Sequence, residues 1–393
     1  MKKIILSTLA SVTLGSLCAS ATTFYQDENG QVFTKPAQGR TEIKTSTPVF
    51  AKASKLKFSG VTYLGYVYDD YKTDTARVDY KSDTSDFEIR RAYLQLKAYL
   101  LDDPKSYFRV TYDLHNDGGS MDVRAKYAYL YLNDIYKNTG VEIGLAHRPW
   151  HDYEEHNAWL YRSISKVLIE DKKSGPDLSN SADFGIMFKT RTQYFDADYG
   201  LFRGEGYHSN GNNGTGLSFE WRATAHLLGT SSHHHPEKNT YWDASFYGQY
   251  NKDHKTIAVG TLNETQDLVF GGLHTVYNQP NFLVAAQYVK SLDTSDIANN
   301  VSLQAGSGYS VNAQYRMGAD KEYSLLARYD SWTPQAVNSA DEKENRSYIL
   351  GGAWKQNHNV EWVANVIVTD NEAGSAKEVE NGTQYMLTAE VKF

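Results

Sequence analysis

Apolar and polar side chains alternate along the last eleven residues, Thr383 to Phe393 (TQYMLTAEVKF). Every second position is apolar and shares one face: Tyr385, Leu387, Ala389, Val391 and Phe393. The other face is polar except for Met386. A period of two is that of a β-strand, and about 9–11 residues let a tilted strand cross a membrane. The segment predicts a membrane-spanning strand with an aromatic residue at its end, although an ordinary sheet strand has the same pattern.

The same alternation recurs along the chain. It is clearest in five segments: Leu56 to Asp69, Phe87 to Leu101, Tyr107 to His115, Gly308 to Met317 and Glu322 to Trp332. In a soluble β-sandwich the polar face of such strands lies outside, whereas in a membrane barrel it lines the lumen. The alternation alone leaves both architectures open.

Short and long connections separate these segments, as periplasmic turns and external loops do in outer-membrane barrels. The short candidates are 102–104, 189–193, 278–281, 318–321 and 356–359. The long candidates are 71–85, 148–180, 205–216, 252–267, 293–307, 334–345 and 370–382. The spacing predicts sixteen strands if the apolar piece Thr256 to Leu262 lies inside an external loop. If that piece is a strand, a further neighbouring piece must be one too, and the spacing then predicts eighteen strands.

The first 21 residues have the order of a secretory signal peptide. Lys2 and Lys3 precede an apolar run from Ile4 to Leu17, and small residues follow it. We expect cleavage after Ala21, since the apolar run is too short to span a bilayer as a helix. Cys18 is then lost with the peptide, and the mature chain has no cysteine for a disulfide or thiol chemistry.

Residues 22–54 do not follow the strand pattern. They contain FYQDENGQVF, in which Asn29-Gly30 is a hairpin signal, followed by a polar stretch. A small periplasmic extension and a disordered leader both fit. The predicted organisation is a signal peptide at 1–21, an N-terminal extension at 22–54 and a β-barrel at 55–393.

Composition favours the membrane barrel. The chain has 30 Tyr, 15 Phe and 7 Trp, yet its mean hydropathy is −0.57. No mature segment holds the roughly 18 apolar residues of a helical span. Without Lys2 and Lys3, 38 basic and 47 acidic residues leave a formal charge of −9, which argues against nucleic acid as a partner. With the export signal, we predict an all-β, transmembrane antiparallel barrel of about sixteen strands in the bacterial outer membrane.

Several strings resemble the phosphate-selective porin O and P family of outer-membrane porins. They are FEIRRAYLQLKAYL (87–100), YFRVTYDL (107–114), VEIGLAHRPW (141–150), the pair GYSVNAQYRM and YSLLARYDSW within 308–332, and YILGGAWKQNHNVEWVANVIVTDN (348–371). The resemblance extends loosely from Leu56 to Phe393. It implies a sixteen-stranded trimeric channel for passive diffusion of small hydrophilic solutes, with a preference for phosphate or other anions in some members. It also implies a third external loop folded into the lumen, and Arg148 to Asn180 matches that loop in position and length.

Basic residues on the polar faces of the early strands and in this loop are the candidate pore-lining, anion-binding residues. Rings of Arg and Lys favour anions, and the Arg guanidinium fork suits phosphate. The candidates are Arg91, Lys97, Arg109, Arg124, Lys126, Arg148, Arg162 and Lys166. The pair Arg90-Arg91 matches the paired arginines of the family, and strict alternation predicts that Arg91 alone points inward.

Two observations limit a specific claim for phosphate. The chain lacks the closely spaced arginine ladder of the phosphate-selective members, since Arg191, Arg203 and Arg222 are well apart. Asp113 and Asp122 share the early strands with the basic residues, and facing carboxylates balance wall arginines in general porins. A general porin, a channel with a preference for phosphate or another anion, and a channel for organic acids or sugars all remain open.

No pattern indicates catalysis, a metal or a cofactor. His233-His234-His235 are consecutive and do not define a tetrahedral site. Ser218 and His226 lie on one strand face about 27 Å apart, too far to react. GNNGTG (211–216) lacks the Lys-Ser/Thr of a phosphate-binding loop. We therefore expect a channel rather than an enzyme.

The expected partners are outer-membrane lipid, small hydrophilic solutes or anions, and two further copies in a homotrimer. A non-conducting barrel that acts as an adhesin or structural protein is the main alternative. A barrel enzyme would need a Ser/His or Asp/His set near one rim. A soluble secreted β-protein would extract without detergent.

Overall fold

The computed structural model describes residues 24–28, 31–43, 55–72, 81–99, 103–116, 121–208, 216–231, 236–259, 262–292, 301–336 and 342–393. The predicted signal peptide, the His233–His235 run and most of the GNNGTG segment lie outside the described residues. The chain divides into two compact units, Met1–Lys55 and Leu56–Phe393.

The described residues of the first unit form a small antiparallel sheet. Its strands are β1 (Phe24–Asp27), β2 (Val32–Phe33) and β3 (Arg40–Ile43), in the order β2-β1-β3. Tyr25 pairs with Phe33 across β1 and β2. The Asn29-Gly30 turn itself lies outside the described residues. The guanidinium carbon of Arg40 lies 3.4 Å from the centroid of the Phe33 ring.

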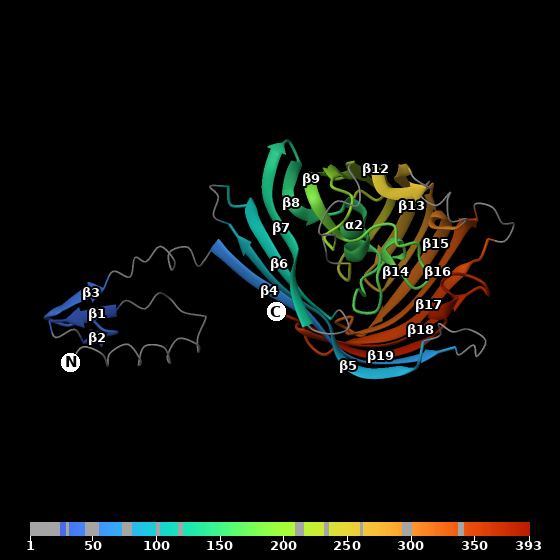
Figure 1. Cartoon of the computed structure of the whole chain (residues 1–393). Coiled ribbons are helices and arrows are strands. Elements are labelled where there is room, and N and C mark those ends of the chain that lie inside the picture. Colours follow the sequence, from blue (N-terminus) through green and yellow to red (C-terminus); the bar gives the residue numbers. More distant parts are fainter. Residues whose placement is uncertain are drawn as a thin grey trace. The chain divides into compact units, whose positions relative to one another are not determined.

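The described residues of the second unit form a closed barrel of sixteen strands in which every neighbouring pair is antiparallel (Figure 1). The strands are β4 (Leu56–Tyr71), β5 (Thr84–Ala98), β6 (Tyr107–Asn116), β7 (Met121–Tyr136), β8 (Thr139–His147), β9 (Ala182–Arg191), β10 (Phe195–Phe202), β11 (Ser218–His226), β12 (Tyr241–Val259), β13 (Leu262–Gln279), β14 (Phe282–Ser291), β15 (Val301–Met317), β16 (Tyr323–Ala336), β17 (Asn345–Lys355), β18 (Val360–Asn371) and β19 (Gly382–Lys392). The last strand closes the barrel against the first, from Gly382↔Tyr71 to Lys392↔Val61. The predicted fold and strand number are confirmed.

The two faces of β19 separate as the alternation predicts. Tyr385 and Leu387 are 45% and 50% exposed on the outer face of the barrel, whereas Met386 is 4% exposed. The apolar exception in the alternation is therefore a side chain that packs inside, beside Val67 in the same buried cluster. The outward apolar face fits lipid, and the inward face belongs to the lumen.

One predicted loop is wrong in detail. Residues Thr256 to Val259 continue β12 and pair with β13, for example Lys255↔Gln266 and Val259↔Leu262. The apolar piece is therefore neither a separate strand nor a loop, but part of a hairpin longer than its neighbours. Thr, Ile and Val in this piece favour extended pairing. Likewise, β15 begins at Val301, inside the stretch expected to be a loop.

A β-bulge changes the direction of the paired arginines on β5. Tyr63 pairs with Arg91 and Leu64 with Ile89, so Arg90 is the extra residue of the bulge. Arg90 Nη1 donates a hydrogen bond to the Sδ atom of the buried Met386. Both arginines therefore point inward, and the prediction that strict alternation admits only Arg91 is wrong.

A second bulge has the same effect on β7. Thr111 pairs with Tyr127 and Tyr112 with Ala125, which leaves Lys126 as the extra residue. Lys126 and Tyr127 are both buried inside the barrel. A bulge places two consecutive side chains on one face, so it concentrates polar groups on the lumen wall.

Helical structure in the described residues is short. It comprises α2 (Pro149–Asn157), η2 (Leu168–Glu170) and η3 (Glu378–Glu380). Among the described residues, no helix has the length and apolarity needed to cross a membrane.

Candidate functional site

The long segment that follows β8 lies within the ring of strands, where α2 is visible in Figure 1. Its first residue, Arg148, is 2% exposed and anchors it. Arg148 Nε donates to Glu220 Oε2 at 2.8 Å, and Nη2 donates to Gln249 Oε1 at 2.9 Å. Because burial of a guanidinium is costly unless it is paired, this contact fixes the start of the loop against β11 and β12. The predicted fold of this loop into the lumen is confirmed.

The loop is attached to one side of the barrel. Tyr153 Oη donates to Asp243 Oδ2 on β12 at 2.7 Å, and the Trp150 ring stacks on Tyr247 at a centroid distance of 3.7 Å. Further along, the wall donates to backbone carbonyls of the loop. These bonds are Tyr241 Oη to Asn157 O at 2.8 Å, Asn312 Nδ2 to Ala158 O at 2.9 Å and Arg328 Nη1 to Lys166 O at 2.9 Å. Hydrogen bonds to β11, β12, β15 and β16 hold the loop against that wall.

A cavity of about 700 Å³ lies between the loop and the other wall, which is formed by β4 to β9. Its lining holds six basic residues: Lys97, Arg109, Lys126, Arg162, Lys189 and Lys392. It also holds three carboxylates: Glu142, Asp152 and Glu155. The lining therefore has more basic than acidic groups, although the whole chain is acidic.

The three carboxylates of this cavity are paired. Glu155 Oε1 lies 3.1 Å from Arg162 Nε. Lys189 Nζ lies 3.2 Å from Glu142 Oε1 and 2.8 Å from Asp152 Oδ2. Two of the six cations, Arg162 and Lys189, therefore pair with all three carboxylates of the lining.

Lys97, Arg109 and Lys126 are held by tyrosines instead of carboxylates. Lys126 Nζ donates to Tyr93 Oη at 3.1 Å and lies 4.7 Å from that ring centroid. The Arg109 guanidinium lies 4.6 Å from the centroid of Tyr127, and Lys97 Nζ lies 4.6 Å from that of Tyr107.

Within the described part of the chain, these three cations form no ion pair. A ring face stabilises a cation without cancelling its charge. The β5–β7 wall therefore keeps a net positive charge.

Arg91 and Arg124 share one carboxylate farther along the same wall. Arg91 Nη1 lies 2.5 Å and Arg124 Nη2 lies 3.1 Å from the same oxygen, Asp113 Oδ2. Asp113 is fully buried, whereas both arginine side chains are partly exposed. Because two cations share one carboxylate, this part of the wall also keeps a positive charge.

Two basic residues of the loop, Arg162 and Lys166, are balanced by carboxylates of the same loop. Arg162 Nη2 lies 3.0 Å from Glu170 Oε2, and Lys166 Nζ lies 3.1 Å from Glu170 Oε1. Burial opposes ionisation of Glu170, but Arg162 and Lys166 overcome it and lower the pKa of this carboxyl below its usual value. The loop thus contributes polarity to the lumen with little net charge.

Two smaller cavities lie on either side of the main cavity. One has a volume of about 320 Å³. Its lining residues lie toward the strand ends that the long connections join. It contains Arg90, Lys166, Lys172 and Lys173 and the carboxylates Asp171 and Asp330. This outer vestibule is therefore also rich in basic groups.

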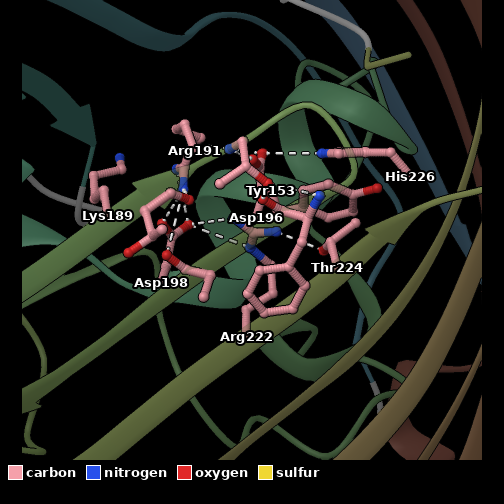
Figure 2. A network of polar contacts seen from close by, with 12 residues as sticks. Tyr153, Lys189, Arg191, Asp196, Asp198, Arg222, Thr224 and His226 are labelled. Atoms are coloured by element: carbon pink, nitrogen blue, oxygen red, sulfur yellow. Dashed lines mark hydrogen bonds and ion pairs between the residues drawn. The ribbon is translucent and has the colours of Figure 1, made fainter. Parts of the chain in front are cut away.

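The other cavity, of about 440 Å³, is rich in acid. It contains Glu142, Asp152, Asp196, Asp198 and Asp243, together with Lys189, Arg191, Arg222 and His226. Figure 2 shows its network: Asp198 accepts from Arg191 at 2.5 Å and from Arg222 at 2.6 Å. His226 lies between Asp243, at 2.7 Å, and Asp196, at 3.4 Å. Mutual pairing of acids and bases rigidifies this region and leaves few groups free for a solute.

The structure thus places the eight predicted site residues in three settings. Lys97, Arg109, Lys126 and Arg162 line the main cavity, and Lys166 lines the outer vestibule. Arg91 and Arg124 meet at Asp113 between those levels. Arg148 lines neither cavity, because it is buried against Glu220 at the start of the loop.

The tyrosines were missed by the sequence analysis. Tyr93 and Tyr127 hold the unpaired cations, and a signal for Tyr93 existed, because it shares the inward parity of Arg91 and Lys97 on β5. The described residues contain no cluster of three His, Cys, Asp or Glu side chains suited to a metal. Ser218 donates to Glu220 and His226 contacts Asp243, so these two residues have separate partners at opposite ends of β11.

The fold is similar to several solved outer-membrane proteins. The anion-selective porin from Comamonas acidovorans matches with a TM-score of 0.59 and 14% identity, covering 86% of this chain and 98% of that chain. A loop-deletion mutant of OmpT, an outer membrane protein of Vibrio cholerae, matches with a TM-score of 0.58 and 14% identity, over 86% and 99% of the two chains. A mutant of the Rh. blastica porin matches with a TM-score of 0.51 and 12% identity, over 86% and 100%.

Comparison of sequences adds no relative, since no family model and no curated protein matches the chain. At 12–14% identity, the structural matches show the fold alone. The chain therefore has the sixteen-stranded β-barrel fold of these outer-membrane porins.

Proposed function

We propose that this protein is an outer-membrane porin through which small hydrophilic solutes diffuse passively, with a preference for anions. The observation that carries the proposal is the set of three cations, Lys97, Arg109 and Lys126, that line the main cavity without an ion pair among the described residues. The similarity of the fold to an anion-selective porin supports the same proposal.

The strand register adds an independent argument. Lys57 lies directly opposite Lys97, and Lys97 lies directly opposite Arg109 on the next strand. Like charges opposite each other destabilise a sheet. A row of three cations across three strands is therefore a cost to the fold, and such local conflicts are expected where function requires them.

Anions would follow this wall because each unpaired cation lowers their energy. A unit charge at 4 Å gains about 1 kcal/mol in bulk water and about 4 kcal/mol near a protein surface. Conduction requires that each site attract an ion enough to admit it and weakly enough to release it. Arg91 and Arg124 on Asp113, then Lys126, Arg109 and Lys97, offer a series of moderate sites rather than one deep one.

Phosphate is one of the anions that this proposal admits. Export through a signal peptide cleaved after Ala21, a periplasmic place for residues 22–54 and assembly as a homotrimer belong to the same proposal. A trimer form of the Vibrio cholerae OmpT supports assembly by analogy of fold.

Planar-bilayer recording of the purified full-length protein tests the channel function. We expect stepwise conductance increments and swelling of liposomes in small neutral solutes. A barrel that inserts without conductance and without swelling would contradict a porin and support the non-conducting alternative.

A further inference from the structure

We propose that the tyrosine-lined cavity favours organic monocarboxylates with an aromatic body over inorganic phosphate. The inference rests on the proposed channel function and names the class of anion that its cationic wall accommodates best.

The cavity wall is an aromatic surface with isolated charges. Tyr63 and Tyr93 meet edge to face at 6.5 Å between ring centroids, and Tyr127 and Tyr129 do so at 6.4 Å. Tyr107 extends the surface beside Tyr129, at 6.2 Å. Aromatic rings in such arrangements offer further edge and face contacts to a planar ligand.

Some N–H groups of these cations already donate hydrogen bonds to side chains of the wall. Arg109 donates from Nε to Thr111 at 3.1 Å and from Nη1 to Tyr129 at 3.2 Å, and Nη1 lies 3.0 Å from His147 Nε2. Lys126 uses one of its three N–H groups on Tyr93. The two Nη2 hydrogens of Arg109 have no hydrogen-bond partner among the described residues.

This distribution of donors suits a carboxylate better than phosphate. A phosphate group carries a charge near −2 and several strong acceptor oxygens, so it needs a dense array of donors in place of its water. A carboxylate has two oxygens and one charge, and one guanidinium edge or one ammonium group satisfies it. The lining supplies separate donors of this kind on three strands, not a cluster of guanidinium forks.

The size and character of the cavity agree with an organic anion. A volume of about 700 Å³ falls within the roughly 300–1,000 Å³ of small-molecule sites. Such sites combine mostly apolar, aromatic walls with a few placed polar groups. Leu160 of the loop and the five tyrosine rings supply the apolar part.

Competition for the chloride current tests the inference at neutral pH. Benzoate, acetate and inorganic phosphate are titrated into both chambers of a bilayer that contains the wild-type channel. We expect benzoate to reduce the chloride conductance at concentrations about three- to tenfold lower than acetate or phosphate, the range expected for one ring contact.

A matched pair of variants assigns the effect to the lining. Tyr127→Leu removes a ring of the cavity, and we expect it to abolish the difference between benzoate and acetate. Tyr199→Leu removes an outward-facing ring that does not line the cavity, and the difference should persist. Migration on SDS gels before and after heating verifies that both variants fold.

The outcomes separate this inference from the proposed function. A chloride-preferring wild-type channel in which benzoate inhibits no better than acetate, or phosphate inhibits best, would overturn the inference and leave the porin intact. Preference for potassium over chloride would overturn the anion preference and with it the inference, whereas a barrel that does not conduct would overturn the porin itself.

Discussion

Lys126 Nζ donates a hydrogen bond to Tyr93 Oη at 3.1 Å and lies 4.7 Å from the centroid of the same ring. The bulge on β7 makes this contact possible, because it leaves Lys126 inside beside Tyr127. A buried ammonium is thereby held in the lumen wall without a carboxylate.

Lys126→Gln should lower the permeability ratio of chloride to potassium by about fivefold, since the variant removes roughly 1 kcal/mol of attraction at a pore-lining position. The reversal potential in a potassium chloride gradient measures the ratio. Lys105→Gln, an exposed position in the turn before β6, is the control and should leave the ratio unchanged. Equal effects in both variants would mean that overall charge, not the wall, sets selectivity.

Asp113→Asn should change selectivity in the opposite direction. Asp113 neutralises part of the charge of Arg91 and Arg124, with contacts of 2.5 and 3.1 Å, and asparagine keeps its shape without the charge. We expect a higher ratio of chloride to potassium permeability. Asp134→Asn, at an exposed position near the end of β7, is the matched control. A decrease in Asp113→Asn would contradict the account.

The contact between Arg148 and Glu220 should control the position of the loop. Arg148→Met leaves a buried carboxylate unpaired, which costs about 3–5 kcal/mol. Arg148→Met with Glu220→Met removes both charges and should be tolerated much better. Single-channel recordings measure the result. The single variant should show excess noise and variable conductance, and the double variant should recover a steady conductance. A double variant as noisy as the single one would show that the loop depends on the charges themselves.

The attachment of the loop should also depend on pH through Glu154. Burial raises the pKa of this carboxyl from 4.5 to about 8, against the opposing influence of Arg328. Because the folded loop prefers the protonated form, its attachment is strongest below pH 4.5. It weakens as the pH rises to about 8, where the proton is lost from the folded loop.

Limited trypsin digestion in detergent at pH 6.5 and 9 measures this effect at Arg162 and Lys166, basic residues within the loop. Glu154→Gln cannot ionise and provides the control at each pH. The ratio of wild-type to Glu154→Gln cleavage should rise with pH. A constant ratio would contradict a pH-dependent attachment.

Much of the barrel could be predicted from the sequence because a period of two fixes both the element and its two faces. The final strand shows this well: Met386, the one break in its apolar alternation, is an inward side chain in the structure. The loop in the lumen was predicted through the family resemblance, by its position and length. Its attachments were not predicted, because Arg148 and Glu220 are separated by 72 residues along the chain.

The details that matter most for the channel required the structure. A bulge adds one residue without altering composition, so the inward positions of Arg90 and Lys126 beside their neighbours have no clear signature in the alternation. Basic residues were chosen as candidates by their charge and by their place on the polar strand faces or in the long loop. Whether a carboxylate neutralises each of them depends on cross-strand partners such as Tyr93 and Asp113. The sequence does not reveal those contacts.

The reversal potential of the wild-type channel, compared with that of a variant carrying Lys97→Gln, Arg109→Gln and Lys126→Gln, tests the central claim most directly. In a potassium chloride gradient, the wild-type potential should lie toward the chloride equilibrium potential. The triple variant should shift toward zero or toward potassium while it still conducts. A wild-type channel that prefers potassium, or a triple variant with unchanged selectivity, would contradict the account.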